Sequence, residues 1–265
     1  HRREGDHADR GQEAQPLSPT DQRPRRIAHR LPASADAIAA LVEAGAQLYE
    51  LDVQWWHDRL VVSHHLPVLR PVPLRPVAAW RRDGLSFAWL REPAGPSLEA
   101  AARRVPDGAG LVLDLKNDRG PEAYRLAEAV AELLTRPALD PAPDPAPDPD
   151  PALALAPALA PALARCVVAS KHWPSLELLA AHGIPTWRTV PGRRALGRLF
   201  RAGPDERHAG VSVRHTLLTP SVLERLRPFG EVVAWTVPTP YRARELCTLG
   251  VSGIVADHPA VLAAA

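Results

Sequence analysis

Two short apolar stretches of this 265-residue chain each carry a pair of charged side chains separated by one leucine. Glu50 and Asp52 form the first pair, and Asp114 and Lys116 form the second. Residues i and i+2 of a β-strand point to the same face, so each pair should project together. Clustered carboxylates repel one another unless a cation lies between them, and oxygen ligands suit Mg²⁺ or Ca²⁺. Glu50, Asp52 and Asp114 therefore predict a divalent metal site, with interior salt bridges as the alternative.

Two histidines end similar apolar stretches. His29 follows residues 27–28, and His64 follows residues 60–63. Imidazole titrates near neutral pH, so such a pair can serve as general base and general acid. Arg30 comes directly after His29, and its planar guanidinium suits the oxygens of a phosphate group. The alternatives are hydrogen-bonding histidines and a surface salt bridge at Arg30.

The stretches that carry these residues alternate with helix-like segments, which favours an α/β fold with a parallel sheet. We expect strands at 27–29, 48–53, 60–64, 111–116, 166–170, 186–190, 211–214, 232–237 and 254–257. We expect helices at 35–44, 98–104, 122–135, 174–181, 220–226 and 241–249. The strands exceed the eight of a closed (β/α)8 TIM barrel by one, so one must lie outside it. Barrel enzymes carry their chemistry at the C-terminal strand ends, where the charged residues lie.

The second and third predicted strands must form an extra β-hairpin. Only residues 54–59 separate them, and parallel neighbours need a much longer connection. If the turn is centred near Asp58, Asp52 faces His64 on the same side of the ribbon. This pairing would bring His64 to the carboxylates.

We expect a single folded domain at residues 25–265. Residues 1–24 form a polar tail without hydrophobic periodicity, which predicts disorder. Residues 137–164 form a low-complexity insert rich in Pro, Ala and Asp, which predicts polyproline-like or disordered chain. Because the insert connects a helix to a strand, we expect it on the face opposite the site.

Composition excludes several classes of function. The chain has 32 basic and 30 acidic residues and a net charge of +2, so nucleic acid is not an expected partner. Cys166 and Cys247 lack the spacing of a zinc site. The uncharged stretch 151–164 is too short and too rich in proline to cross a bilayer, and no signal-peptide pattern is present. We expect a cytoplasmic protein without stable membrane insertion that acts on a small molecule; its oligomeric state is not predicted.

The order of these motifs resembles the glycerophosphodiester phosphodiesterase family, a metal-dependent TIM barrel related to phosphatidylinositol-specific phospholipases C. The resemblance begins at Ile27 and extends to the end of the chain. The family's His-Arg-Gly, Glu-Leu-Asp, His-Asp and Glu-x-Lys motifs correspond to His29-Arg30-Leu31, Glu50-Leu51-Asp52, His64-His65 and Asp114-Leu115-Lys116. Later matches are Ser170, Trp235-Thr236-Val237 and Gly253-Ile254-Val255-Ala256-Asp257-His258-Pro259.

The resemblance implies hydrolysis of glycerophosphodiesters, or of related lipid-headgroup phosphodiesters, with Mg²⁺ or Ca²⁺. Its implied site consists of the metal ligands Glu50, Asp52 and Asp114, the phosphate-binding Arg30 and Lys116, the pocket residue Trp235, and the catalytic His29 and His64. The metal and the cations would stabilise charge at phosphorus, while the histidines would exchange protons with the nucleophile and the leaving alcohol.

Three positions depart from the family pattern. Leu31 replaces a glycine, His65 replaces an aspartate, and Pro238 stands where asparagine is frequent. The hairpin is also one residue shorter than usual, so His65 could take the catalytic place of His64. Two other functions stay open: a phospholipase-C-like or sphingomyelinase-D-like lyase that forms a cyclic phosphate, and a barrel that binds a phosphorylated ligand without turnover. A third and weaker alternative is a Pro- and Arg-rich interaction protein.

Overall fold

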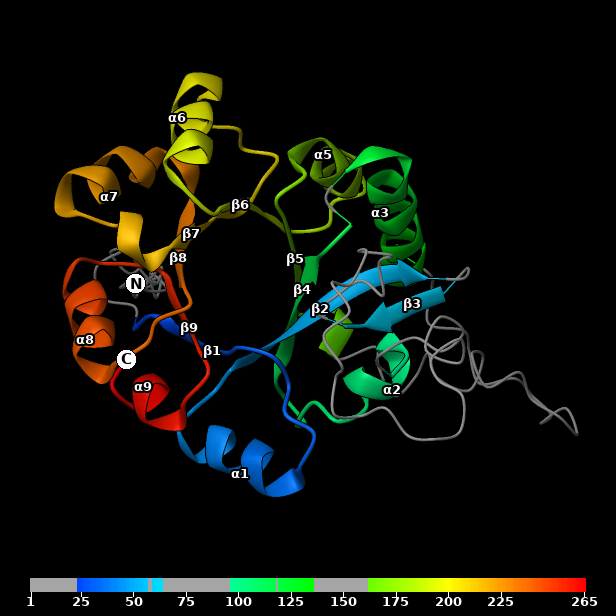
Figure 1. Ribbon diagram of the computed structural model, residues 1–265, viewed down its shortest axis with the longest axis horizontal. Coiled ribbons are helices and arrows are strands. Elements are labelled where there is room, and N and C mark those ends of the chain that lie inside the picture. Colours follow the sequence, from blue (N-terminus) through cyan, green and yellow to red (C-terminus); the bar gives the residue numbers. More distant parts are fainter. Residues whose placement is uncertain (1–22, 57–58, 64–95, 118, 136–161) are drawn as a thin grey trace, which may run out of the picture.

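The computed structural model describes residues 23–56, 59–63, 96–117, 119–135 and 162–265. Its strands form a sheet in which β1 pairs with both β2 and β9, so eight parallel strands close a barrel (Figure 1). The predicted TIM barrel is thereby confirmed. The strands are β1 (Arg25–Ala28), β2 (Leu48–Trp56), β3 (Arg59–Val62), β4 (Gly110–Leu115), β5 (Cys166–Ser170), β6 (Thr186–Val190), β7 (Gly210–Arg214), β8 (Glu231–Trp235) and β9 (Gly253–Ala256).

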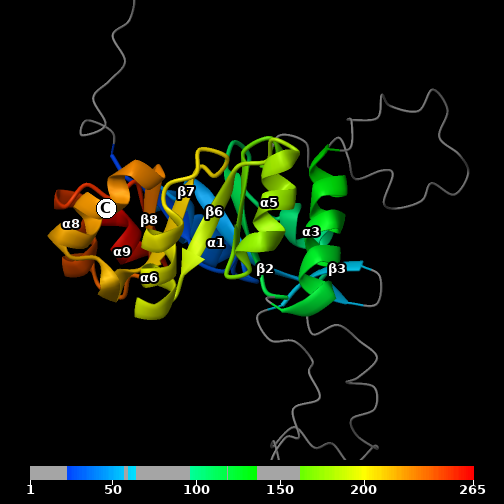
Figure 2. The same ribbon diagram turned by 90° about the horizontal axis from the view of Figure 1, so that it is seen from above.

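Helices surround the barrel on its outer side, as Figures 1 and 2 show. Ser34, Ser97, Thr219 and Thr239 cap four of them by accepting a backbone N–H, and each such cap contributes about 1 kcal/mol. The α-helices are α1 (Ala35–Glu43), α2 (Leu98–Ala102), α3 (Gly120–Thr135), α5 (Trp173–Ala181), α6 (Arg193–Ala202), α7 (Pro220–Leu226), α8 (Pro240–Thr248) and α9 (Pro259–Ala263). The 3₁₀ helices are η2 (His215–Leu217) and η3 (Arg227–Phe229). The sequence analysis did not predict α6 or α9.

The barrel has two separate apolar layers. Its interior is filled by one cluster of side chains from alternate strand positions: Ile27, Leu48, Val112, Val167, Ala169, Trp187, Val233 and Val255. The intervening positions, among them Leu51 and Leu113, pack in a second cluster with the surrounding helices. This alternation fixes which side chains continue into the barrel at its C-terminal end.

The predicted β-hairpin is confirmed, but its register is not the expected one. The strand β3 is antiparallel to β2, with Val53 opposite Val62 and Trp56 opposite Arg59. Ser63 then lies opposite Asp52, and its backbone N–H donates to the Asp52 carbonyl oxygen at 2.9 Å. The turn is thus centred half a residue earlier than expected, and the predicted pairing of Asp52 with His64 is wrong.

Several expectations concern residues that the structure does not describe. Most of the predicted N-terminal tail and of the 137–164 insert lies outside the described residues, as do His64 and His65. Where the chain is described, Cys166 is buried, and burial raises the pKa of its thiol to about 12. No described helix has the length and apolar character that crossing a membrane requires.

Candidate active site

Three carboxylates from β2 and β4 meet inside the barrel, where the paired part of the two strands ends. Glu50 and Asp52 follow the interior residue Leu48 at alternate positions, and Asp114 follows Val112 in the same way. The two strands run in register, with Asp52 opposite Asp114. One oxygen from each carboxylate lies within 4.8 Å of the others. Alternation along two neighbouring strands is therefore sufficient to gather the predicted acidic residues.

Two cations contact this acidic cluster. The Lys116 ammonium lies 2.6 Å from Asp52 Oδ1 and also bonds Asp114 Oδ2. The Arg30 side chain reaches Asp52 Oδ2 with its Nε at 3.5 Å. The Arg30 backbone N–H donates to Glu50 Oε2 at 2.9 Å, so the carboxylate also anchors the turn after β1. The structure thus brings together five of the predicted site residues.

The turn after β1 has a backbone conformation that most residues avoid. Arg30 has a φ of 58°, and it is the only non-glycine residue with a positive φ in the described chain. Such a conformation costs about 1–2 kcal/mol for an L-residue. Two backbone hydrogen bonds to Glu50 hold it, from the Arg30 N–H to the carboxylate and from the Leu31 N–H to the Glu50 carbonyl oxygen at 3.2 Å. Leu31, which replaces the glycine of the family motif, does not share this conformation. The replacement of glycine by leucine therefore brings no left-handed strain.

Burial and like charge make it unfavourable to ionise all three carboxylates of the acidic cluster. Burial, with the neighbouring charges of Asp52 and Asp114, raises the pKa of Glu50 well above its usual range. Burial also raises the pKa of Asp114, although Lys116 opposes this shift. Burial disfavours the Lys116 ammonium, but Asp114, Glu50 and Asp52 outweigh it and raise the pKa of Lys116. Three carboxylates face two cations, so full ionisation of the cluster would leave one unbalanced negative charge, which adds to burial in raising the pKa of Glu50.

These features fit a divalent cation. The Asp114 Oδ1 atom is buried and has no hydrogen-bond partner among the described residues, which is costly for a carboxylate oxygen. A cation within reach of Glu50, Asp52 and Asp114 would satisfy that oxygen and remove the excess negative charge. The donor set consists of carboxylate oxygens, which Mg²⁺ and Ca²⁺ prefer.

His29 lies beside the carboxylates at the end of β1. Its Nε2 is 4.0 Å from Glu50 Oε2, and its Nδ1 is 2.6 Å from Asp257 Oδ1. A carboxylate can only accept, so Nδ1–H donates to Asp257, and Nε2 points toward the cluster. The sequence analysis included Asp257 in a motif but gave it no role, since nothing in the sequence shows that it contacts a residue 228 positions away.

We expect Asp257→Asn to lower kcat about 10- to 100-fold while leaving KM nearly unchanged. The change removes the charge that holds the His29 ring and its tautomer, whereas the groups that bind a phosphate stay in place. Steady-state kinetics with a phosphodiester substrate measure both parameters. Asp107→Asn is the matched control, because Asp107 is exposed and lies near the opposite end of the barrel. A loss that appears only in KM would contradict this positioning role.

The remaining predicted residues have different surroundings. Trp235 ends β8 and packs against the interior cluster, and its indole Nε1 is buried without a hydrogen-bond partner in the described chain. Ser170 is fully buried, and its Oγ accepts the His172 backbone N–H at 3.0 Å, which is a structural role. His64, the second predicted histidine, lies outside the described residues.

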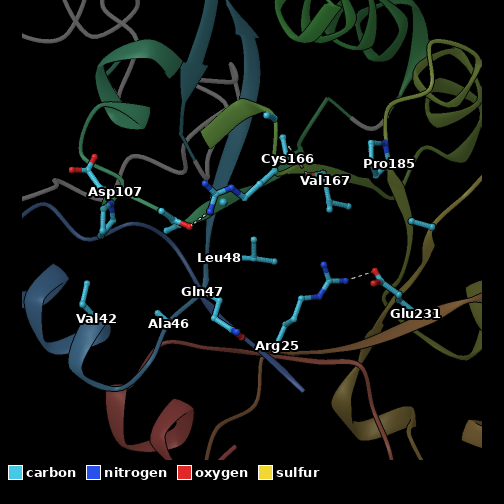
Figure 3. Close-up of a pocket in the computed structure, with 17 residues that line it drawn as sticks. Arg25, Val42, Ala46, Gln47, Leu48, Asp107, Cys166, Val167, Pro185 and Glu231 are labelled. Carbon is cyan, nitrogen blue, oxygen red and sulfur yellow. Dashed lines mark hydrogen bonds and ion pairs between the residues drawn. The ribbon is translucent and has the colours of Figure 1, made fainter. Parts of the chain in front are cut away.

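A cavity of about 780 Å³ lies at the other end of the barrel (Figure 3). It is lined by the first residues of several strands, including Leu48 and Gly110. Across it, Arg25 pairs with Glu231, which also accepts from Trp187 Nε1 at 2.9 Å. The acidic cluster is not part of its lining. Since TIM-barrel enzymes carry their chemistry at the C-terminal face, this cavity is not the candidate active site.

Comparisons with solved structures agree with the fold. A glycerophosphodiester phosphodiesterase from Thermotoga maritima matches with a TM-score of 0.58 and 18% identity, covering 91% of this chain and 97% of the other. A phosphodiesterase from Oleispira antarctica, in complex with the product sn-glycerol-3-phosphate, matches with a TM-score of 0.58 and 19% identity, covering 91% and 96%. The glycerophosphoryl diester phosphodiesterase domain of a Mycobacterium tuberculosis protein matches with a TM-score of 0.56 and 18% identity, covering 91% and 98%. No family model and no curated protein sequence matches this chain. The chain therefore has the fold of these phosphoric diester hydrolases, as the motif resemblance predicts.

Proposed function

We propose that the protein is a metal-dependent phosphodiester hydrolase acting on glycerophosphodiesters or related lipid-headgroup phosphodiesters. The observation that carries this proposal is the meeting of three carboxylates, two cations and an oriented imidazole at one end of the barrel. The complex of the structurally similar Oleispira antarctica protein with sn-glycerol-3-phosphate supports the substrate class. The site belongs on the face where barrels of this kind carry their chemistry.

In this proposal Glu50, Asp52 and Asp114 hold Mg²⁺ or Ca²⁺. When bound, the divalent cation supplies Lewis-acid charge that stabilises negative charge developing on phosphate oxygens. The requirement for it follows from the like charges of the cluster, because the raised pKa of Glu50 means that the three carboxylates ionise together only with difficulty unless a further cation is present. With the cation present, the site has a net positive charge that attracts a substrate carrying one negative charge.

Arg30 and Lys116 then orient the phosphate. Both side chains already contact the carboxylates that would hold the cation. Arg30 is half-exposed at the rim of the site, where an entering anion can meet its guanidinium. A guanidinium offers two parallel donors to phosphate oxygens, whereas an ammonium acts as a compact charge. Trp235 would contact the rest of the substrate with the exposed part of its indole ring.

His29 acts as the general base in this proposal. Asp257 keeps the proton on Nδ1, so Nε2 can take a proton from the attacking water. A second histidine would protonate the departing alcohol. His64 was preferred for this role because of its expected pairing with Asp52, but the observed register places Ser63 there. The register thus removes the reason for preferring His64 to His65.

Alanine substitutions at His64 and His65 should separate the two candidates. We expect one of the variants to lose turnover about 10²- to 10⁴-fold and the other to lose less than 10-fold. The variant with the larger loss should lose less turnover on a p-nitrophenyl phosphodiester. The leaving group of that substrate needs no proton, so a general acid is dispensable. Equal and small losses in both variants would contradict a general acid in this part of the chain.

The proposed reaction is tested by following glycerophosphocholine with phosphorus NMR in the presence of Mg²⁺ or Ca²⁺ and of a chelator. We expect a phosphate monoester as product, formed only with the divalent cation. A cyclic phosphate that persists would instead show the lyase reaction, in which a neighbouring hydroxyl of the substrate attacks. If glycerophosphodiesters with different headgroups gave no product but the protein still bound phosphate, the proposed hydrolase activity would be contradicted. The protein would then be a phosphate-binding barrel.

A further inference from the structure

A second buried charge lies on the outer side of the barrel, away from the proposed active site. Trp187 of β6 packs in the barrel interior, so its neighbour Arg188 points outward, toward the helices α5 and α6. Arg188 is only 5% exposed. Arginine is almost never buried to this extent unless an anionic group pairs with it.

The guanidinium of Arg188 has no such partner in the described chain. Its Nε and Nη2 atoms are buried and make no hydrogen bond. Two aromatic rings lie near it, with Cζ 5.8 Å from the Trp173 centroid and 5.6 Å from the Phe229 centroid. Rings attract a cation at such distances but leave its N–H groups without strong acceptors. Burial accordingly lowers the pKa of Arg188, even though Asp205 and Glu177 oppose this shift from farther away.

Arg188 borders a cavity of about 540 Å³ between α5, α6 and the loop that leads to β7. The cavity wall includes Trp173 and His208, and acidic residues occur at its edge. Both oxygens of Asp205 are engaged by Arg207, at 3.0 and 2.8 Å, so this carboxylate is already neutralised. Glu177 is exposed, and water screens its charge.

His208 adds no second cation to the cavity. It is buried, and its Nδ1 lies 2.7 Å from Thr186 Oγ1. Burial, with the nearby charge of Arg188, lowers the pKa of His208, so the ring is neutral at physiological pH. The buried guanidinium is therefore the principal uncompensated charge on the inner wall of this cavity, among the residues that the structure describes.

We propose that this cavity binds a small oxyanion, a phosphate or a carboxylate group, through the guanidinium of Arg188. The planar fork of Arg188 matches two oxygens of either group, and the volume lies in the range of small-molecule sites. The proposal does not depend on the proposed catalytic activity, because the barrel wall separates Arg188 from the acidic cluster. It assigns a ligand site to a part of the fold that the reaction does not use.

The experiment compares the thermal unfolding of the wild-type protein and Arg188→Met in titrations with inorganic phosphate and with acetate, at constant ionic strength set by chloride. The wild-type Tm should rise by about 3 °C at an anion concentration tenfold above Kd. The response of Arg188→Met should be smaller, since it lacks the fork. Any phosphate bound at the proposed active site contributes equally to both proteins, so their difference reports the new site. In chloride alone Arg188→Met should have the higher Tm, because methionine removes an unpaired buried charge.

Arg198→Met is the matched control, because Arg198 is exposed on α6 and stacks on the same Trp173 ring, with Cζ 3.9 Å from its centroid. It should keep the wild-type response to the anions. Arg188→Lys provides a second variant that keeps the charge, and its response should weaken several-fold rather than vanish. A response to phosphate alone would identify the group as phosphate. Equal responses in the wild-type protein and both Arg188 variants, or no response to either anion in the wild-type protein, would overturn the proposal.

Discussion

Replacing His29 by alanine should lower kcat for glycerophosphodiester hydrolysis about 10²- to 10⁴-fold, the usual contribution of a general base. The structure gives His29 the geometry of such a base, with Nδ1 bonded to Asp257 at 2.6 Å and Nε2 directed toward the carboxylates. Alanine removes the proton acceptor but none of the metal ligands. Turnover measured under saturating substrate and divalent cation reports the loss directly.

The control for His29→Ala is His182→Ala, since His182 is exposed at the end of α5 and makes no contact with the acidic cluster. We expect this variant to keep the wild-type kcat. Divalent-cation binding should be the same in both variants, which separates loss of the base from loss of the metal site. A His29→Ala protein with wild-type kcat would show that the base is another group.

Replacing Lys116 by methionine should lower the free energy of unfolding of the metal-free protein by about 3–5 kcal/mol, as for other broken buried ion pairs. Lys116 is largely buried and contacts both Asp52 and Asp114. Methionine fills a similar volume but leaves the carboxylates without this cation. Denaturant unfolding in the presence of a chelator measures the difference.

A divalent cation should restore part of the stability lost in Lys116→Met, because it would neutralise the same carboxylates. Arg194→Met is the matched control, since Arg194 is an exposed cation on α6, away from the acidic cluster. We expect its stability to change by less than about 0.5 kcal/mol, as is usual for surface substitutions. If Lys116→Met were as stable as the wild-type protein without metal, the conclusion that Lys116 offsets repulsion among the buried carboxylates would be wrong.

Much of the fold was predictable because each strand is short, apolar and bounded by polar residues. All nine predicted strands are present, and the alternation of Glu50 with Asp52 and of Asp114 with Lys116 predicted their common face. Only eight strands can close the barrel, and the short predicted link at residues 54–59 identified β3 as the extra strand. Local patterns therefore fixed the barrel and its acidic cluster.

Other features depend on information that local patterns lack. The helix α6 was missed because four arginines and Gly197 obscure its apolar face, which Leu196 and Leu199 form inside the protein. The hairpin register depends on the exact turn geometry, and a shift of one residue reverses the face of every side chain. The contacts of His29 with Asp257 and of Arg188 with Phe229 join distant segments, so no spacing rule could show them.

The central claim, that Glu50, Asp52 and Asp114 hold a divalent cation for phosphodiester chemistry, is tested most directly by the anomalous scattering of crystals grown with Mn²⁺. Mn²⁺ accepts the same carboxylate ligands as Mg²⁺ and can be located without assumption. We predict an anomalous peak about 2.0–2.6 Å from an oxygen of each of the three carboxylates. A fully occupied peak elsewhere, with these carboxylates paired only to Lys116 and Arg30, would contradict the account.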